Sequence, residues 1–130
     1  MADLVSIIIP CYNDGKYLPE AVASARAQSY PDIEIIIVND YSTDPLTNSL
    51  LEKFAAEGIT VINTAAGKKG LSAARNTAIE AASGKYILPL DADDKVDPTY
   101  VEKSVTVLDR KPDVLVCTAR VRFFGLRHHE

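Results

Sequence analysis

The chain has 130 residues, of which 47% are hydrophobic and 25% are charged, and these are ordinary values for one globular domain. The formal net charge is −4 and there is no basic patch rich in aromatic residues, so we expect no binding to nucleic acid. No apolar run approaches the roughly 20 residues that span a bilayer. Cys11 and Cys117 match neither a disulfide framework nor a metal-binding knuckle, so we expect two free thiols.

Two apolar, β-branched runs at residues 5–10 and 33–38 predict strands that are buried on both faces. Pro10 is expected to end the hydrogen bonding of the first strand. A helix is expected between the two runs, from about residues 16–18 to residue 28, because Pro19 fits only in a first turn. Its apolar residues recur at helical spacing and are Leu18, Ala21, Val22 and Ala25.

The alternation of strand and helix continues through the middle of the chain. Asp44 and Pro45 predict an N-cap and a first helical position, and Gly58 predicts the end of that helix. The buried stripe expected on this helix consists of Leu46, Leu50, Leu51 and Phe54. Residues 59–63 are then expected to form a third, shorter strand.

The second half of the chain repeats the same pattern. A third helix is expected to end at Ser83 and Gly84, with Leu71, Ala74, Ala78, Ile79 and Ala82 on its buried side. Residues 85–90 predict a fourth, buried strand, and residues 114–117 begin a fifth. Asp97 and Pro98 predict the start of a fourth helix, whose buried stripe is Val101, Val105 and Leu108.

This alternation predicts one α/β domain over residues 1–130, with a mainly parallel, Rossmann-like sheet covered by helices on both faces in three layers. In such sheets ligands bind beyond the carboxyl ends of the strands. The residues that follow the first, second and fourth strands should therefore converge on one site. They are Tyr12 and Asn13, Asn39 and Asp40, and the run from Asp91 to Asp93.

Three carboxylates, those of Asp91, Asp93 and Asp94, lie within four residues directly after the fourth apolar run. Carboxylates this close repel one another unless they are solvated, hydrogen-bonded or bound to a metal ion. Hard oxygen ligands at this spacing suit Mg²⁺ or Mn²⁺, and such an ion in turn suits a diphosphate. The alternative is an acidic loop that also caps the next helix.

A nucleoside diphosphate across these strand ends would meet suitable side chains. The ring of Tyr12 can stack on a base, the carboxylate of Asp40 can accept a base N–H, and Arg75 offers a planar fork of donors. Lys68 and Lys69 lead into a helix N-terminus, which is electropositive.

Each of these residues also has a structural alternative. Tyr12 can be a wall residue, and Asp40 can fix its own turn through an Asx hydrogen bond. Arg75 can pair with Asp40 or Glu80, and the two lysines can belong to a solvated loop.

Four segments resemble motifs of the family 2 glycosyltransferases, which have the GT-A fold. Their sequences are SIIIPCYN at residues 6–13, VNDYSTD at 38–44, GLSAARN at 70–76 and LDADD at 90–94. The last resembles the DxD motif of that family. The four motifs occur in the order and spacing of the family, and the resemblance covers essentially the whole chain.

The resemblance implies metal-assisted transfer of a sugar from a nucleoside-diphosphate sugar, commonly a UDP-sugar, to an acceptor hydroxyl with inversion. The acceptor would be a carbohydrate or a glycolipid. It implies that Asp93 is a direct ligand of Mn²⁺ or Mg²⁺ and that Asp91 contacts the ribose or the metal site. The nucleotide-binding residues that it implies are Pro10, Tyr12, Asn13, Asp40, Arg75 and Asp91.

The chain departs from the family pattern in two places. Tyr41 stands where the family commonly has glycine, so strain is expected if that position needs a positive φ. After Asp113 the only acid is Glu130, so we expect the catalytic base, and the acceptor-binding half, beyond residue 130. The parent protein is expected in the cytoplasm or at the inner face of a membrane. Phe123, Phe124 and Leu126 are candidates for a homodimer contact.

Two other functions remain open from the sequence alone. The chain can be a module that binds a nucleotide sugar without turnover. It can also be a phosphotransferase of the haloacid dehalogenase type, with Asp91 as nucleophile. That class usually carries its Asp-x-Asp motif on the first strand, whereas here the motif follows the fourth.

Overall fold

The computed structural model describes residues 3–111 and shows four parallel strands in the order β3-β2-β1-β4. The strands are β1 (Val5–Cys11), β2 (Ile33–Asn39), β3 (Thr60–Asn63) and β4 (Tyr86–Pro89). The helices are α1 (Leu18–Arg26), α2 (Pro45–Ala56), α3 (Leu71–Ala81) and α4 (Tyr100–Arg110). Strand and helix alternate along the chain, which confirms the predicted α/β class.

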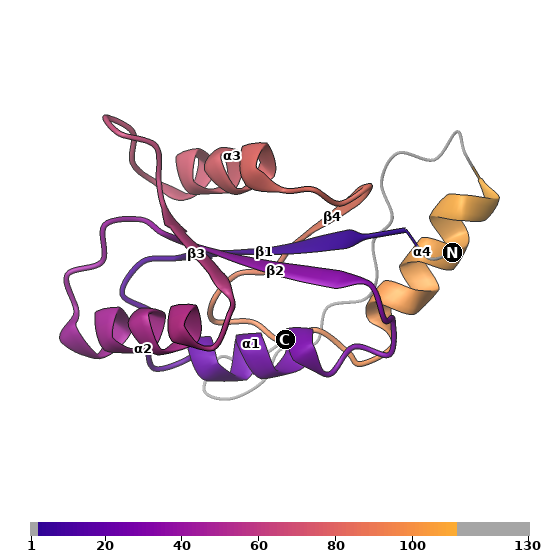
Figure 1. The fold of residues 1–130 in the computed structure, drawn as a ribbon, viewed down its shortest axis with the longest axis horizontal. Helices are drawn as coiled ribbons and strands as arrows, with labels where there is room; N and C mark the ends of the chain where they lie inside the picture. Colours follow the sequence, from indigo (N-terminus) through magenta and orange to yellow (C-terminus); the bar gives the residue numbers. More distant parts are fainter. Residues whose placement is uncertain (1–2, 112–130) are drawn as a thin grey trace, which may run out of the picture.

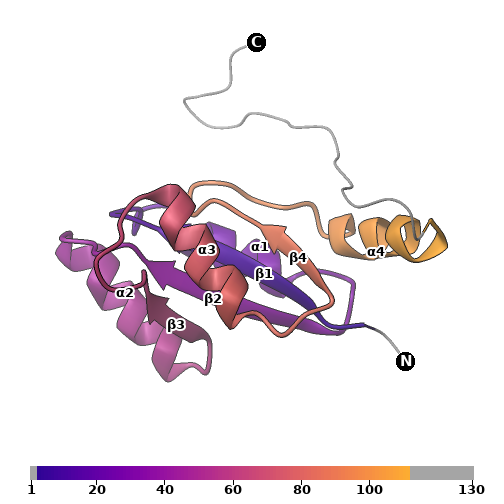
Figure 2. The same ribbon diagram turned by 90° about the horizontal axis from the view of Figure 1, so that it is seen from above.

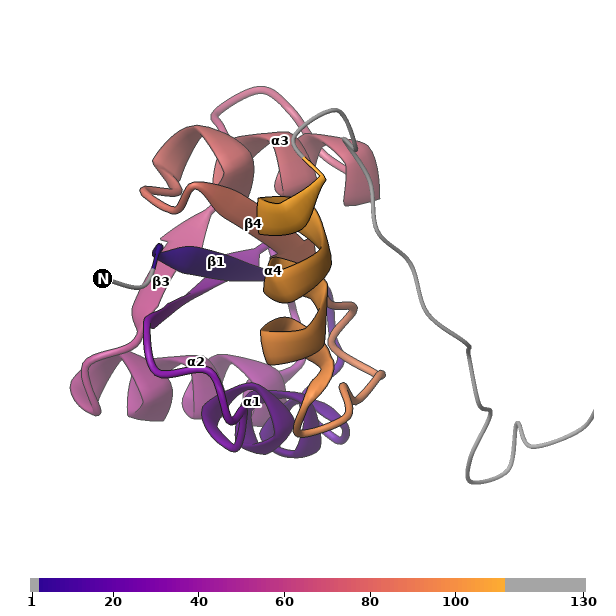
Figure 3. The same cartoon turned by 90° about the vertical axis from the view of Figure 1, so that its right-hand side faces the viewer.

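Helices cover both faces of the sheet. In Figure 1, α3 lies on one face, and α1 and α2 lie on the other. Figure 2 shows α3 crossing over the central strands, and the end-on view in Figure 3 shows the three layers with α4 in front of them. The strands run the same way, so their carboxyl ends meet at one edge, which is the edge far from α4.

The core lies on both sides of β1, which is buried along its whole length. Ile7 and Ile9 face the larger cluster, which includes residues of α1, α2 and α4, whereas Ile8 packs with Ala74 and Ala78 of α3. Burying an isoleucine side chain contributes about 1.5–3 kcal/mol. The small alanines let α3 lie close to the sheet, so its N-terminus is held near the strand ends.

A polar network fixes the opposite, amino end of the sheet. The hydroxyl of Ser6 on β1 donates to Glu34 on β2, and the same carboxylate oxygen accepts the N–H of Ser83 at 2.7 Å. The N–H of Gly84 donates to Ser6 Oγ at 2.8 Å. A Cβ atom at residue 84 would lie 2.6 Å from the Ser6 nitrogen, so only glycine fits there. This network explains why a glutamate, Glu34, occurs within the otherwise apolar strand β2.

Several expected boundaries and burials are corrected by the structure. Pro10 does not end β1, because the strand continues in register through the pair Cys11 and Asn39. Asp97 does not cap α4, which begins at Tyr100, but accepts a hydrogen bond from the N–H of Thr99 at 3.0 Å. The first helix ends at Arg26 rather than near residue 28.

The buried stripes are also narrower than predicted. Leu46, Leu71 and Ile79 are exposed, because the sheet meets α2 and α3 along Thr47 and Leu51 and along Ala74 and Ala78 instead. The fourth strand was expected to be buried. In the part of the chain that the structure describes, β4 is instead an edge strand, and its side chains are only partly buried or exposed. The predicted fifth strand and the three C-terminal apolar residues lie outside the described residues. Among residues 3–111, no helix has the length and apolarity to cross a membrane.

Candidate functional site

A cavity of about 510 Å³ opens where the carboxyl ends of β1, β2 and β4 meet. Its walls come from the exits of these strands and from the start of α3, and they include Pro10, Cys11, Tyr12, Asp14, Asp40, Lys69, Gly70, Leu71, Ala74, Asp91, Ala92 and Asp93. Segments far apart in the sequence thus surround one space. This confirms the predicted convergence of the three strand exits.

Asp40 is 6% exposed and is bound on both carboxylate oxygens. Oδ1 accepts a hydrogen bond from the hydroxyl of Thr64, and Oδ2 accepts one from the N–H of Gly70, each at 2.9 Å. A side-chain bond that fixes this turn comes from the neighbour of Asp40, because Asn39 Oδ1 accepts the N–H of Ser42, three residues on, at 2.9 Å. Asp40 therefore joins the end of β2 to both ends of the loop before α3.

Tyr41 has a φ of +58°, so the position does require the left-handed conformation that glycine adopts most easily. Its hydroxyl donates to the carbonyl of Thr64 at 2.7 Å. Tyr41 thus adopts the backbone conformation of a glycine, and its side chain extends to the backbone directly after β3. The expected strain is present, and a hydrogen bond compensates part of it.

Asn13 also has a positive φ, of +54°. Its side-chain oxygen accepts the N–H groups of Thr43 and Asp44 at 2.8 and 2.9 Å, and its own N–H donates to Ser42 Oγ at 3.0 Å. These bonds tie the loop after β1 to the loop before α2. Asn13 does not line the cavity, and its nucleotide-binding role stays a prediction.

Arg75 pairs with Asp91, at 2.8 Å between Nη2 and Oδ1, and not with Asp40 or Glu80. Both side chains are more than one-third exposed, so the pair contributes only about 0–1 kcal/mol to stability. The Arg75 Nε atom is buried and has no hydrogen-bond partner among the described residues. The pair fixes the orientation of Asp91 at the mouth of the acidic loop.

One carboxylate oxygen from each of Asp91, Asp93 and Asp94 lies within 4.8 Å of the other two. A turn brings them together, because the N–H of Asp94 donates to the carbonyl of Asp91 at 3.0 Å. Oxygens on opposite sides of a Mg²⁺ ion are about 4.2 Å apart, so small side-chain rotations would let these hard oxygen donors hold Mg²⁺ or Mn²⁺. The family resemblance assigns the metal site to Asp91 and Asp93, and the structure places the third carboxylate of the acidic run, that of Asp94, beside them.

Two residues at the end of β1 line the cavity, Tyr12, which the sequence suggested as a wall residue, and Cys11, which it did not. Cys11 is buried at the end of β1 as a free thiol, and burial raises the pKa of that thiol from 9.0 to about 11. Tyr12 is 47% exposed, and the ammonium group of Lys69 lies over its ring, 6.0 Å from the centroid.

The sheet order and the cavity at the strand ends define an α/β ligand-binding domain of the Rossmann-like class. The model of the family described as "Glycosyl transferase family 2" matches residues 6–130. The chain therefore belongs to glycosyltransferase family 2, and residues 3–111 are the N-terminal part of a GT-A fold.

Known proteins agree with this assignment. The uncharacterized glycosyltransferase YibD of Escherichia coli is 41% identical over 120 residues, which are 88% of this chain and 33% of YibD. The structure of TarS residues 1–349 of S. aureus in complex with UDP-GlcNAc has a TM-score of 0.73 and 28% identity, over 84% of this chain and 32% of that one.

A mannosyltransferase of Pyrobaculum calidifontis, PcManGT, in complex with GDP-Man and Mn²⁺, has a TM-score of 0.73 and 26% identity. That match covers 83% of this chain and 33% of the other. The chain thus spans about a third of the length of these relatives. Membership of this family leaves the haloacid dehalogenase alternative without support.

Proposed function

We propose that the protein containing this chain transfers a sugar from a nucleoside-diphosphate sugar, most simply a UDP-sugar, to an acceptor hydroxyl with inversion at the sugar carbon. The observation that carries the proposal is the single cavity that brings together Tyr12, Asp40 and the acidic loop from Asp91. The relatives TarS and PcManGT, whose complexes contain UDP-GlcNAc and GDP-Man, support a donor of this class.

The base of the donor is proposed to lie near β1 and β2. Pro10 and the ring of Tyr12 form one wall for it, and a lone pair of the buried Asp40 carboxylate can accept a base N–H. Because Asp40 is already held by two hydrogen bonds, it would not need to be ordered when the base binds. Asn13 supports this wall by fixing the loop after β1.

The diphosphate and ribose are proposed to lie toward the acidic loop. Asp91, oriented by Arg75, is placed for the ribose or the metal site, and Asp93 and Asp94 complete a set of hard oxygen donors. A divalent ion held there would stabilise the negative charge of the leaving diphosphate. Arg75, which is paired with Asp91, would add a second positive charge next to that of the divalent ion.

The remaining parts of the reaction are proposed by analogy with the family. The base that takes the proton of the acceptor hydroxyl is assigned to sequence beyond residue 130, together with the site for a carbohydrate or glycolipid acceptor. The reaction is placed in the cytoplasm or at the inner face of a membrane. A homodimer through the C-terminal apolar residues is a further expectation.

The test is turnover by the parent protein with Mn²⁺. We expect release of UDP from a UDP-sugar, at a rate that increases when a carbohydrate acceptor is added. An Asp32→Asn variant, which removes a charge at the amino end of the sheet, is expected to keep the activity. Metal-dependent binding without any turnover would instead favour a module that binds the nucleotide sugar only.

A further inference from the structure

The charges around the cavity are unbalanced. Four carboxylates line it, those of Asp14, Asp40, Asp91 and Asp93, and Arg75, beside the cavity, offsets the charge of Asp91. Among the described residues that line the cavity itself, Lys69 supplies the only cationic group. A diphosphate entering this space would be repelled by the carboxylates unless cations offset them. A divalent ion at the acidic loop would provide one source of positive charge, and Lys69 would provide another.

Lys69 is held at the cavity wall by the residue that follows it. The N–H of Gly70 donates to Asp40, and the hydroxyl of Thr64 donates to the same carboxylate, so both ends of the loop of residues 64–70 are fixed to one buried side chain. Gly70 has a φ of +105°, which adds a constraint that other residues rarely meet. The backbone next to Lys69 is therefore in a defined position.

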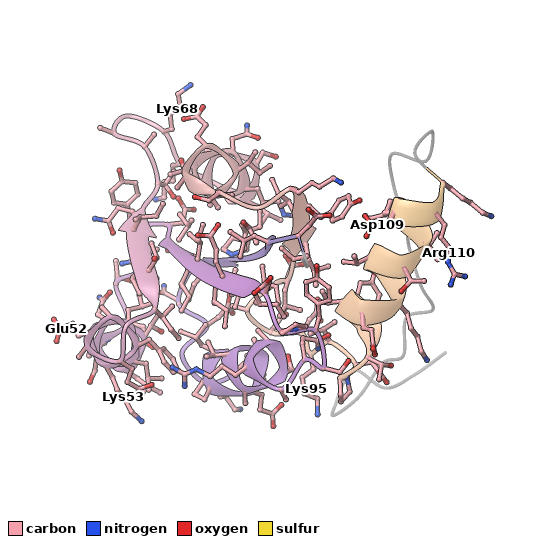
Figure 4. All side chains as sticks on the ribbon, turned by 45° about the vertical axis from the view of Figure 1, so that its right-hand side comes forward. Glu52, Lys53, Lys68, Lys95, Asp109 and Arg110 are labelled. Carbon is pink, nitrogen blue, oxygen red and sulfur yellow. The ribbon has the colours of Figure 1, made fainter. Side chains whose placement is uncertain are left out.

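Lys68 is one residue away but in a different environment. It does not line the cavity, its N–H closes a turn onto Ala65, and Figure 4 shows its side chain extending outward from the loop before α3. The two lysines thus have the same charge and almost the same position in the sequence, but only Lys69 faces the ligand space. This makes Lys68 a matched control.

The contact that Lys69 makes is easily exchanged. A cation over an exposed aromatic ring is held weakly, whereas a hydrogen bond between an ammonium group and a phosphate oxygen is charge-assisted and stronger. The ammonium group lies over the ring of Tyr12, 6.0 Å from its centroid, and this ring is the one proposed to hold the base. The diphosphate, which is joined to that base through the ribose, would come within reach of the same flexible side chain.

We propose that Lys69 is a phosphate-binding residue of the donor site, whose ammonium group moves from the ring of Tyr12 to the diphosphate when the nucleotide binds. The inference rests on the proposed function and adds a residue that the family resemblance did not supply. A phosphate contact from Lys69 would give the donor site a higher affinity for nucleoside diphosphates than for nucleosides. This difference in affinity would not depend on the metal ion alone.

The test compares Lys69→Gln with Lys68→Gln in the full-length protein, by titration with UDP and with uridine in the presence of Mn²⁺. Lys69→Gln is expected to weaken UDP binding about fivefold or more, and uridine binding less than about twofold. Lys68→Gln is expected to change neither. Equal loss of UDP and uridine, or equal effects of the two variants, would overturn the inference.

A second measurement uses the unmodified protein and does not depend on folding of a variant. UDP with Mn²⁺ is expected to protect Lys69 from acetylation, as read by mass spectrometry, whereas uridine does not, and Lys68 reacts equally in every sample. If UDP bound but did not protect Lys69, the proposed role of Lys69 would be overturned, and the proposed function would not be affected. If the protein bound no nucleoside diphosphate at all, the proposed function would fail and this inference with it.

Discussion

The carboxylate of Asp40 accepts a hydrogen bond from the backbone N–H of Gly70 at 2.9 Å. This single bond connects the carboxyl end of β2 with the N-cap residue of α3, 30 residues later in the chain. The second oxygen of Asp40 is held by Thr64 at the end of β3. The residue that the family resemblance assigns to the base is therefore also the residue that orders the loop beside it.

Replacing Asp40 with alanine should destabilise the fold as well as weaken binding. The change leaves the Gly70 N–H and the Thr64 hydroxyl without their acceptor, and an unsatisfied buried polar group costs about 1–3 kcal/mol. We expect the free energy of unfolding in urea to fall by about 2–4 kcal/mol. Asp40→Asn keeps one acceptor oxygen and should lose less.

The same variants test whether Asp40 contacts the base. Asp40→Asn, in the folded protein, should weaken UDP binding more than pyrophosphate binding, because pyrophosphate has no base. The comparison is made by calorimetry at the same Mn²⁺ concentration. An equal loss for both ligands would show that Asp40 does not contact the base.

Tyr41 offers a test of the strained turn. At a φ of +58°, glycine is favoured over a residue with a Cβ atom by about 1–2 kcal/mol, so Tyr41→Gly should be more stable than Tyr41→Ala by roughly that amount. Tyr41→Phe should lose about 0.5–1.5 kcal/mol, because it removes the hydroxyl that donates to the Thr64 carbonyl at 2.7 Å and more weakly to the Ala65 carbonyl at 3.5 Å. Urea denaturation measures all three. An alanine variant as stable as the glycine variant would argue against strain.

Part of this architecture could be predicted from the sequence because it depends on local chemistry. The N-cap of α2 is such a case, since Asp44 accepts the N–H of Thr47 at 3.1 Å, as the Asp-Pro pair indicates. The convergence of Tyr12, Asp40 and Asp91 could also be predicted from the sequence, because parallel strands place their carboxyl ends at the same end of the sheet.

What the sequence did not predict depends on contacts between distant segments. Thr64 and Gly70 could not be assigned to Asp40, nor Ser83 to Glu34, before the strand order and the loop positions were known. The exposure of Leu71 has the same origin, because helical spacing gives a stripe but does not say how much of it the sheet covers.

Asp93→Ala should abolish the effect of the metal on nucleotide binding while leaving the fold intact. Asp93 is half-buried at the surface of the acidic loop and is not part of either hydrophobic core cluster. We expect UDP affinity to become the same with and without Mn²⁺, and the circular dichroism spectrum to stay unchanged. Asp32→Asn, at the other end of the sheet, is the charge-matched control. A metal dependence that survives in Asp93→Ala would contradict the assignment.

Cys11 should stay a neutral and poorly reactive thiol over the physiological pH range. Its pKa is raised to about 11, so at pH 8 the reactive thiolate is about 100-fold scarcer than for a thiol of pKa 9.0. Alkylation measured against pH in a Cys117→Ser background should accelerate toward pH 11 and not level off near pH 9. Levelling near pH 9 would contradict the burial effect.

The raised pKa of Cys11 also affects stability. The native thiol keeps its proton to about pH 11, whereas the unfolded thiol loses it near pH 9, so the stabilising contribution is complete below pH 9 and is lost between pH 9 and 11. Cys11→Ala lacks this loss, so the stability difference between the two proteins should change over that interval alone.

The most direct test of the central claim is calorimetric titration of the 130-residue chain with UDP, GDP and dTDP, each with and without Mn²⁺. The cavity at the strand ends and the acidic loop beside it predict saturable binding of one of these nucleotides that requires the metal ion. Such a result would establish the donor site and identify the donor class. If none of the three bound in the presence of Mn²⁺, the proposal that this cavity holds a nucleoside-diphosphate sugar would be contradicted.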